Sequence, residues 1–155
     1  MSEIIIIGGG PAGMMAAISS KLHHPDAKVY LLERNDVLGK KLRLTGGGRC
    51  NVTANVDIET VIANVPKNGR FLYSALNEFG PQKIIQFFNE NKCPLIEEDH
   101  FRMFPKSNKA SDIIDTFLNV MNKLKVKVFI NHLYKISTLT IELLHYKIRL
   151  LNMIP

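Results

Sequence analysis

The chain has 155 residues, of which 46% are hydrophobic and 22% charged, so an extended disordered chain is excluded and one globular domain with a real core is expected. The formal net charge is +6, from 20 Lys and Arg against 14 Asp and Glu. Residues 121–155 hold six of the basic residues and one acid, so the excess charge belongs to the last stretch and does not by itself predict a nucleic-acid partner.

The stretch Ile4–Ser20 carries no charge and could be mistaken for a signal peptide or a membrane span. Glu3 stands where a signal peptide needs positive charge, and Gly8–Gly10 with Pro11 interrupt an apolar run that a span needs for about 20 residues. We therefore expect no membrane partner. The two cysteines cannot form a disulfide framework, which favours a cytoplasmic location.

The same stretch predicts a strand, a turn and a helix. Ile4–Ile7 is the β-branched run of a strand buried on both faces of a parallel sheet. Pro11 fits the first position of a helix, where its missing N–H costs no hydrogen bond. Four apolar residues at helical spacing are expected to pack this helix on the sheet: Met14, Ala17, Ile18 and Leu22. Val29–Leu32 predicts a second strand, and such a βαβ unit requires a parallel sheet.

The rest of the chain predicts further helices, a hairpin and a third strand. Residues 57–64, 71–79 and 82–91 are predicted to form short helices, and Pro94–Pro105 a hairpin or a pair of turns. A longer amphipathic helix, capped by Ser111 or an earlier residue, is predicted from the spacing of Ile113, Ile114, Phe117, Leu118, Met121 and Leu124. The sequence of residues 126–130 predicts a third buried strand. We therefore expect an α/β fold whose parallel sheet has strands near residues 3–7, 28–33 and 126–130.

The turn Gly8–Gly13 satisfies the pattern G-x-G-x-x-G, and its context is that of a dinucleotide-binding βαβ unit. Gly8 permits a tight turn, Gly10 lets a pyrophosphate approach the backbone, and Gly13 lets the helix pack close to the strand. Glu33 ends the second strand about 20 residues later, where an acid accepts hydrogen bonds from an adenosine ribose. A glycine-rich turn without a ligand is the alternative. FAD and NAD both carry ADP, so this unit leaves the choice between them open.

A second glycine loop, Thr45–Asn51, contains three consecutive glycines. Such a run costs conformational entropy unless a backbone must approach something closely. Arg49 adds a cationic fork and Asn51 an amide, which suit a phosphate or the polar edge of a flavin, and Arg49 is a candidate to stabilise charge on a reduced flavin. A flexible surface loop is the alternative interpretation.

These motifs together resemble a bacterial family of FAD- and NAD(P)-dependent oxidoreductases, labelled BaiN/RdsA-like or aminoacetone-oxidase-like. The resemblance runs from about residue 4 to about residue 136, and the triple-glycine motif is its most specific part. It is carried by Gly8–Gly13, Leu31–Asn35, Leu38–Leu42, Thr45–Asn51, Arg70–Ala75 and Phe104–Ala110.

The resemblance implies a Rossmann-like FAD/NAD(P)-binding domain over residues 1–136, with the helical segment 54–108 inserted before the third strand and covering the cofactor side. FAD would be held by the first βαβ unit, with NAD(P)H a candidate electron donor and a small molecule as substrate. No metal is implied, and the substrate, the catalytic residues and the oligomeric state are not assigned. The implied cofactor-binding residues are Gly8, Gly10, Pro11, Ala12, Gly13, Glu33, Arg34, Lys41, Gly46, Gly47, Gly48, Arg49 and Asn51.

The chain also departs from the family pattern. Family members are longer and continue through a small meander to an Ala-Thr-Gly-Gly strand end, whereas this sequence diverges from Ser137 onward. We therefore expect residues 137–155 to be a divergent tail and the fold to be incomplete relative to the family. A non-catalytic ADP- or NAD-binding module, or an inactive fragment, is the alternative to a flavin-dependent oxidoreductase.

Other reactive residues lack a supporting pattern. Cys50 has no C-x-x-C partner, so it is interpreted as structural rather than redox-active. The acidic run Glu97–Asp99 is interpreted as a solvated turn rather than a metal site. Tyr73 and His100 are candidate proton donors that nothing in the sequence selects.

Overall fold

The computed structural model describes residues 2–132, so the predicted tail lies outside the described residues. The main sheet has the strand order β1–β2–β6, formed by Glu3–Ile7, Lys28–Leu32 and Lys127–Phe129. Both pairings are parallel, with Ile5 opposite Tyr30 in the first and Tyr30 opposite Lys127 in the second. The structure thus confirms the predicted α/β class, the parallel sheet and the places of its three strands.

Only the central strand is buried on both faces. Residues 29–32 of β2 are at most 1% exposed, whereas Ile7 of β1 is 51% exposed and Val128 of β6 is 36% exposed. Within the described residues β1 and β6 are the sheet's edge strands, each with a neighbour on one side only. The prediction that β1 is buried on both faces is therefore wrong, and so is the prediction that residues 126–130 form a buried strand.

One face of the sheet is covered by the helices α1, Pro11–His23, and α5, Ala110–Lys123. Met14, Ala17 and Ile18 of α1 are buried as predicted. Leu22 is 60% exposed, because the last turn of α1 leads into the exposed turn that reverses the chain. The prediction that Leu22 packs on the sheet is therefore wrong.

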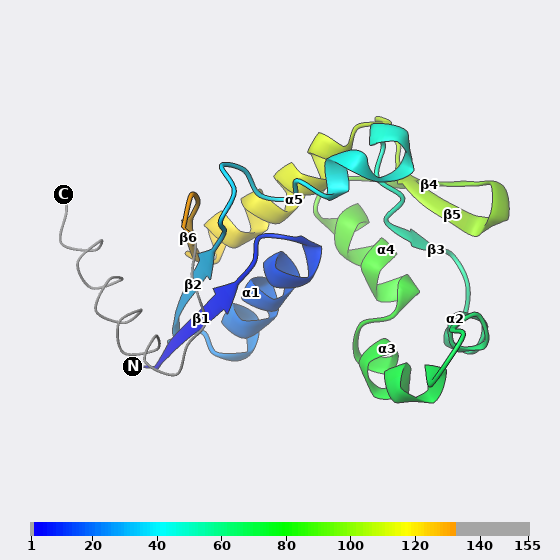
Figure 1. Cartoon of the computed structure of the whole chain (residues 1–155), viewed down its shortest axis with the longest axis horizontal. Helices are drawn as coiled ribbons and strands as arrows, with labels where there is room; N and C mark the ends of the chain where they lie inside the picture. The colour runs from blue at the N-terminus through cyan, green and yellow to red at the C-terminus, as the bar shows by residue number, and fades with distance from the viewer. Residues whose placement is uncertain (1, 133–155) are drawn as a thin grey trace.

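The middle of the chain forms a separate layer of helices and a small antiparallel sheet (Figure 1). Its helices are α2, Ile58–Ala63, α3, Tyr73–Phe79, and α4, Pro81–Glu90, which confirms the three predicted helices. The small sheet has the order β3–β5–β4, formed by Thr53–Ala54, Arg102–Pro105 and Leu95–Glu98, so the predicted hairpin is also confirmed. No helix within residues 2–132 is long and apolar enough to cross a membrane.

Helix α5 joins the two parts of the structure, with the parallel sheet and α1 at one end and the hairpin and α4 at the other (Figure 1). Phe117 of α5 is 4% exposed and meets Phe88 of α4 edge to face, with ring centroids 5.4 Å apart. Helix α5 begins at Ala110, and its N-cap residue is Lys109, which precedes Ser111 in the sequence. No side chain caps it.

Replacing Phe117 with Ala tests this shared core. We expect Phe117→Ala to lower the free energy of unfolding by about 3–5 kcal/mol, because a buried ring leaves a cavity between α4 and α5. The matched control Leu118→Ala, one residue away and 37% exposed, should cost about 1 kcal/mol or less. Denaturant unfolding followed by circular dichroism measures both, and equal losses would contradict the assigned core.

Candidate functional site

The fold constrains three glycines of the turn between β1 and α1, namely Gly8, Gly13 and Gly9, where a Cβ would lie 2.3 Å from the side chain of Leu38, but it does not constrain Gly10. Gly8 has a φ of +107°, a conformation that favours glycine. A Cβ on Gly13 would lie 1.9 Å from the carbonyl oxygen of Gly8, so only glycine lets α1 pack so closely. Gly10 has an ordinary φ of −78°, and a Cβ there would meet no atom within 4 Å. The space in front of Gly10 is therefore open to a ligand.

The N-terminus of α1 faces this open space. Gly10 is its N-cap, and no side chain hydrogen-bonds to the first turn. The first N–H groups of a helix have no partner within the helix, and they carry the positive end of its dipole. Pro11 and Ala12 are exposed at this end, so the helix start is accessible to an anion.

Glu33 lies directly behind the turn and is 7% exposed. Its Oε2 accepts a hydrogen bond from the backbone N–H of Gly9 at 2.5 Å. Its Oε1 accepts from the backbone and the side-chain nitrogen of Asn35, at 2.8 and 2.5 Å. Burial raises the pKa of Glu33, but the hydrogen bonds from Asn35 and Gly9 and the nearby charge of Arg34 outweigh it and lower the pKa overall. The carboxylate is therefore ionised at neutral pH.

A cavity of about 400 Å³ opens beside Glu33 at the carboxyl ends of the strands. Its wall is closed by the chain that follows β6, since Asn131 N–H donates to the carbonyl of Asn35 and His132 N–H to that of Glu33. Sequence reasoning missed His132, although parallel strands all end at one edge of a sheet and the third strand was predicted. The lining residues are Ile7, Gly8, Leu32, Glu33, Arg34, Asn35 and His132.

The second glycine loop packs on the β4–β5 hairpin. Gly46, Gly47 and Gly48 all have positive φ, between +57° and +87°. A Cβ on Gly46 would lie 2.9 Å from the ring of Phe104, whereas one on Gly47 would meet nothing within 4 Å. Gly46 therefore packs against the hairpin, whereas the space in front of Gly47 is open, as it is in front of Gly10.

Arg49 ties this loop to the hairpin. Its Nη1 is 2.6 Å from Oε1 of Glu98, and its guanidinium carbon is 4.1 Å from the centroid of the Phe104 ring. Nη1 also donates to Oδ1 of Asn108 at 3.2 Å. Sequence reasoning missed Glu98 and Phe104 as partners. The interpretation of the acidic run as a solvated turn is wrong for Glu98, which is half-buried in this ion pair.

A second cavity, of about 450 Å³, brings the two glycine motifs together. Pro11 and Ala12 come from the start of α1, while Thr45, Cys50 and Asn51 come from the second loop. Most of the remaining wall is apolar: Met15, Leu42, Val52, Phe79, Ile84, Phe88, Ile113 and Phe117. An apolar cavity with a few polar groups at one end suits a flat ring system.

The other predicted residues lie apart from these two cavities or at their margin. Arg34 is exposed and lines the 400 Å³ cavity, whereas Lys41 is exposed and lines neither cavity. The hydroxyl of Tyr73 donates to Glu59, and His100 lies in the turn of the β4–β5 hairpin. Within the described residues no group of His, Cys, Asp and Glu is arranged to hold a metal ion.

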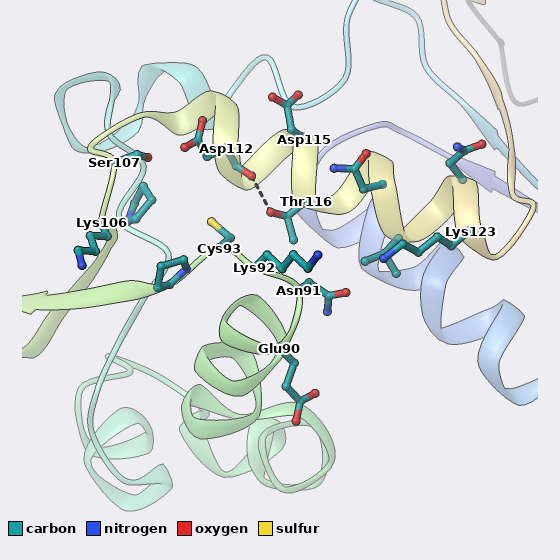
Figure 2. Close-up of a pocket in the computed structure, with 15 residues that line it drawn as sticks. Glu90, Asn91, Lys92, Cys93, Lys106, Ser107, Asp112, Asp115, Thr116 and Lys123 are labelled. Atoms are coloured by element: carbon teal, nitrogen blue, oxygen red, sulfur yellow. Dashed lines mark hydrogen bonds between the residues drawn. The ribbon is translucent and has the colours of Figure 1, made fainter.

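A cavity of about 770 Å³, larger than both of these, lies elsewhere (Figure 2). Its walls come from the end of α4, the segment between α4 and β4, the end of β5 and one side of α5. Three lysines balance three acids among its lining residues, and neither glycine motif contributes to it. The carboxyl end of α4 also presents the negative end of its dipole to this region. We therefore place the candidate site at the two smaller cavities.

Both cysteines are predicted to be unreactive in the folded protein. Cys50 is 1% exposed and Cys93 is 5% exposed, and burial raises the pKa of each thiol. We expect iodoacetamide at neutral pH to modify neither thiol in the native protein and both in guanidinium chloride, as counted by mass spectrometry. Fast native modification of Cys50 would contradict the structural interpretation.

The link between Arg49 and Glu98 is tested by a double-mutant cycle. We expect Arg49→Met and Glu98→Gln to be coupled by about 0.5–1 kcal/mol in the free energy of unfolding, because the pair is only partly screened by solvent. Glu97→Gln is the control, since Glu97 lies beside Glu98 but accepts from Asn55 instead. A coupling no larger than that between Arg49→Met and Glu97→Gln would show that the ion pair does not hold the loop.

Comparisons with known proteins show the family of the chain and support its fold. Residues 2–148 match the model of the HI0933-like protein Rossmann domain. The chain is 31% identical over 130 residues to a 3-dehydro-bile acid delta(4,6)-reductase of Clostridium scindens, covering 83% of this chain and 31% of the relative. It is also 31% identical over 121 residues to the ribosomal RNA dihydrouridine synthase of Escherichia coli, covering 78% of this chain and 29% of the relative. The chain thus spans about a third of the length of these relatives.

A solved structure supports the fold. The crystal structure of Thermovibrio ammonificans THI4 matches with a TM-score of 0.51 at 16% identity, covering 83% of this chain and 38% of the other. At this identity the match concerns the fold alone. Because the family model covers nearly the whole chain and the βαβ unit has the geometry that its motif predicts, the chain belongs to the HI0933-like Rossmann-domain family.

Proposed function

We propose that this chain is the FAD-binding part of a flavin-dependent oxidoreductase. The observation that carries the proposal is the open space at Gly10, the N-cap of the free start of α1, directly after Gly9, whose N–H donates to the ionised carboxylate of Glu33. A glycine that the fold does not need is explained by a ligand that must approach its backbone. Family membership and the reductase among the relatives support the same function.

The residues present fit the two halves of FAD. The start of α1, with Gly8, Gly10, Pro11, Ala12 and Gly13, would bind the pyrophosphate through backbone N–H groups. Glu33 and Arg34 would hold the adenosine ribose in the 400 Å³ cavity. Asn51 would border the flavin ring at the apolar cavity, and Gly46–Gly48 precede it in the same loop. Lys41 lies outside both cavities and would add an exposed cation for the phosphates.

When bound, FAD supplies the hydride chemistry, and the chain's own residues bind it, orient it and exclude water. The apolar walls from α4 and α5 would keep water from one side of the ring, and the amide of Asn51 would orient its polar edge. The charge of Arg49 is already paired with Glu98, which favours a role in holding the loop over a role in compensating a reduced flavin. A small-molecule substrate and NAD(P)H as electron donor complete the proposal.

A second candidate is a non-catalytic module that binds ADP or NAD. One observation favours it. The start of α1 and the cavity beside Glu33 are sufficient to bind ADP, and no catalytic role is assigned to any residue that forms them. The two candidates differ in whether the chain retains flavin.

Gly10→Ala separates ligand binding from folding. We expect the wild-type chain to bind FAD with a flavin absorbance spectrum, and Gly10→Ala to weaken that affinity by about tenfold or more, because the methyl group would occupy the space of the pyrophosphate. The thermal midpoint should stay within about a degree or two of wild type, since the new Cβ contacts no protein atom. Fluorescence titration of FAD measures the affinity.

Gly47→Ala serves as a comparison, because its Cβ also meets nothing within 4 Å but its φ of +65° predicts a loss of stability. ADP binding without FAD binding would support the non-catalytic module. An equal FAD affinity for wild type and Gly10→Ala would overturn the assignment of α1 as the pyrophosphate site.

A further inference from the structure

The carboxylate of Glu33 has most of its hydrogen-bonding capacity filled by the protein itself. Gly9 donates to Oε2, and Asn35 donates twice to Oε1. A carboxylate offers about four acceptor positions, so these three bonds leave about one position for a ligand. That position is on Oε2, because Oε1 already accepts two hydrogen bonds.

Asn35 is the residue that creates this asymmetry. Its side-chain nitrogen is 2.5 Å from Oε1 of Glu33, and its backbone nitrogen is 2.8 Å from the same atom. Its carbonyl oxygen accepts from the N–H of Asn131, so the segment after β6 holds Asn35 in place. Asn35 therefore connects the carboxylate to the far wall of the 400 Å³ cavity.

We propose that Asn35 is a positioning residue of the nucleotide site, which holds Oε1 of Glu33 so that Oε2 is presented to one hydroxyl of the adenosine ribose. This inference rests on the proposed function. The role of Asn35 is additional to the roles that the G-x-G-x-x-G turn and Glu33 have in binding a nucleotide. Without the side-chain donor, the carboxylate would be free to rotate about its last bonds and to lose its fixed direction.

The other ionisable groups that face Glu33 are few. Arg34, on the same segment, is exposed, and its charge favours the ionised carboxylate. His132, on the segment after β6, lines the same cavity, and the turn before α1 contributes the backbone N–H of Gly9, which is not ionisable. Asn35 is thus the side chain whose removal changes the carboxylate most directly.

The first experiment needs no ligand. NMR titration of the side-chain carboxyl carbon of Glu33 is compared in wild type, Asn35→Ala, Asn35→Asp and the control Asn119→Ala. Hydrogen bonds from Asn35 lower the pKa of Glu33, so we expect the midpoint to move to higher pH in Asn35→Ala. Asn35→Asp keeps the side chain's size but replaces a donor with a charge of the same sign, so its midpoint should move further. Asn119 lies on α5 in the 770 Å³ cavity, and its variant should titrate as wild type does.

The second experiment measures ADP binding by calorimetry at neutral pH, above the Glu33 midpoint that the first experiment measures in each variant. We expect roughly a two- to tenfold loss of affinity in Asn35→Ala, the effect of about one net hydrogen bond, and no loss in Asn119→Ala. Circular dichroism establishes that each variant is folded, and Asn35→Asp replaces Asn35→Ala if the latter unfolds.

The outcomes are distinguishable. An unchanged Glu33 midpoint in both Asn35 variants overturns the positioning role, whatever the protein binds. A shifted midpoint with unchanged ADP affinity shows that Asn35 tunes Glu33 without orienting it for the nucleotide, and it also overturns the proposal. A wild-type chain that binds no ADP overturns the proposed function itself.

Discussion

The carbonyl oxygen of Gly8 lies so close to Gly13 that a single added methyl group would approach it to 1.9 Å. This contact lets α1 start directly after β1, with its free N–H groups at the carboxyl edge of the sheet. The same edge holds the end of β2, where Glu33 accepts the N–H of Gly9. Close packing at one glycine therefore brings a helix N-terminus and an ionised carboxylate to the two sides of one turn, which is what a dinucleotide requires.

The second glycine loop depends on a contact far along the chain. Arg49 reaches Glu98 and covers Phe104, which lie on the two strands of the hairpin, and Gly46 packs on the same ring. Phe88 and Phe117 then connect the hairpin side to α5 and so to the parallel sheet. The two glycine motifs face one apolar cavity because this chain of contacts fixes the loop relative to α1.

Local patterns predicted the elements well, because each has a local cause. The βαβ unit follows from an apolar run, a glycine turn and Pro11, and the hairpin follows from its alternation of apolar residues. The partners of Arg49 could not be predicted, since a salt bridge between residues 49 positions apart has no local signal. The burial of β1 and β6 was predicted incorrectly for a related reason. An apolar strand sequence shows that a strand exists but not whether it lies at the centre or the edge of a sheet. The roles of Asn35 and His132 could not be predicted for the same reason, because they depend on the three-dimensional geometry of the cavity.

We propose that the start of α1, the Glu33 carboxylate and the chain after β6 form one nucleotide site. Chemical-shift mapping of backbone amides during titration with ADP tests it most directly. The account predicts shifts concentrated at Gly9–Gly13, at Glu33–Asn35 and at His132, with the residues of the 770 Å³ cavity unaffected. Shifts centred on that larger cavity, around Lys92 and Lys123, or no shifts at saturating ADP, would contradict the account.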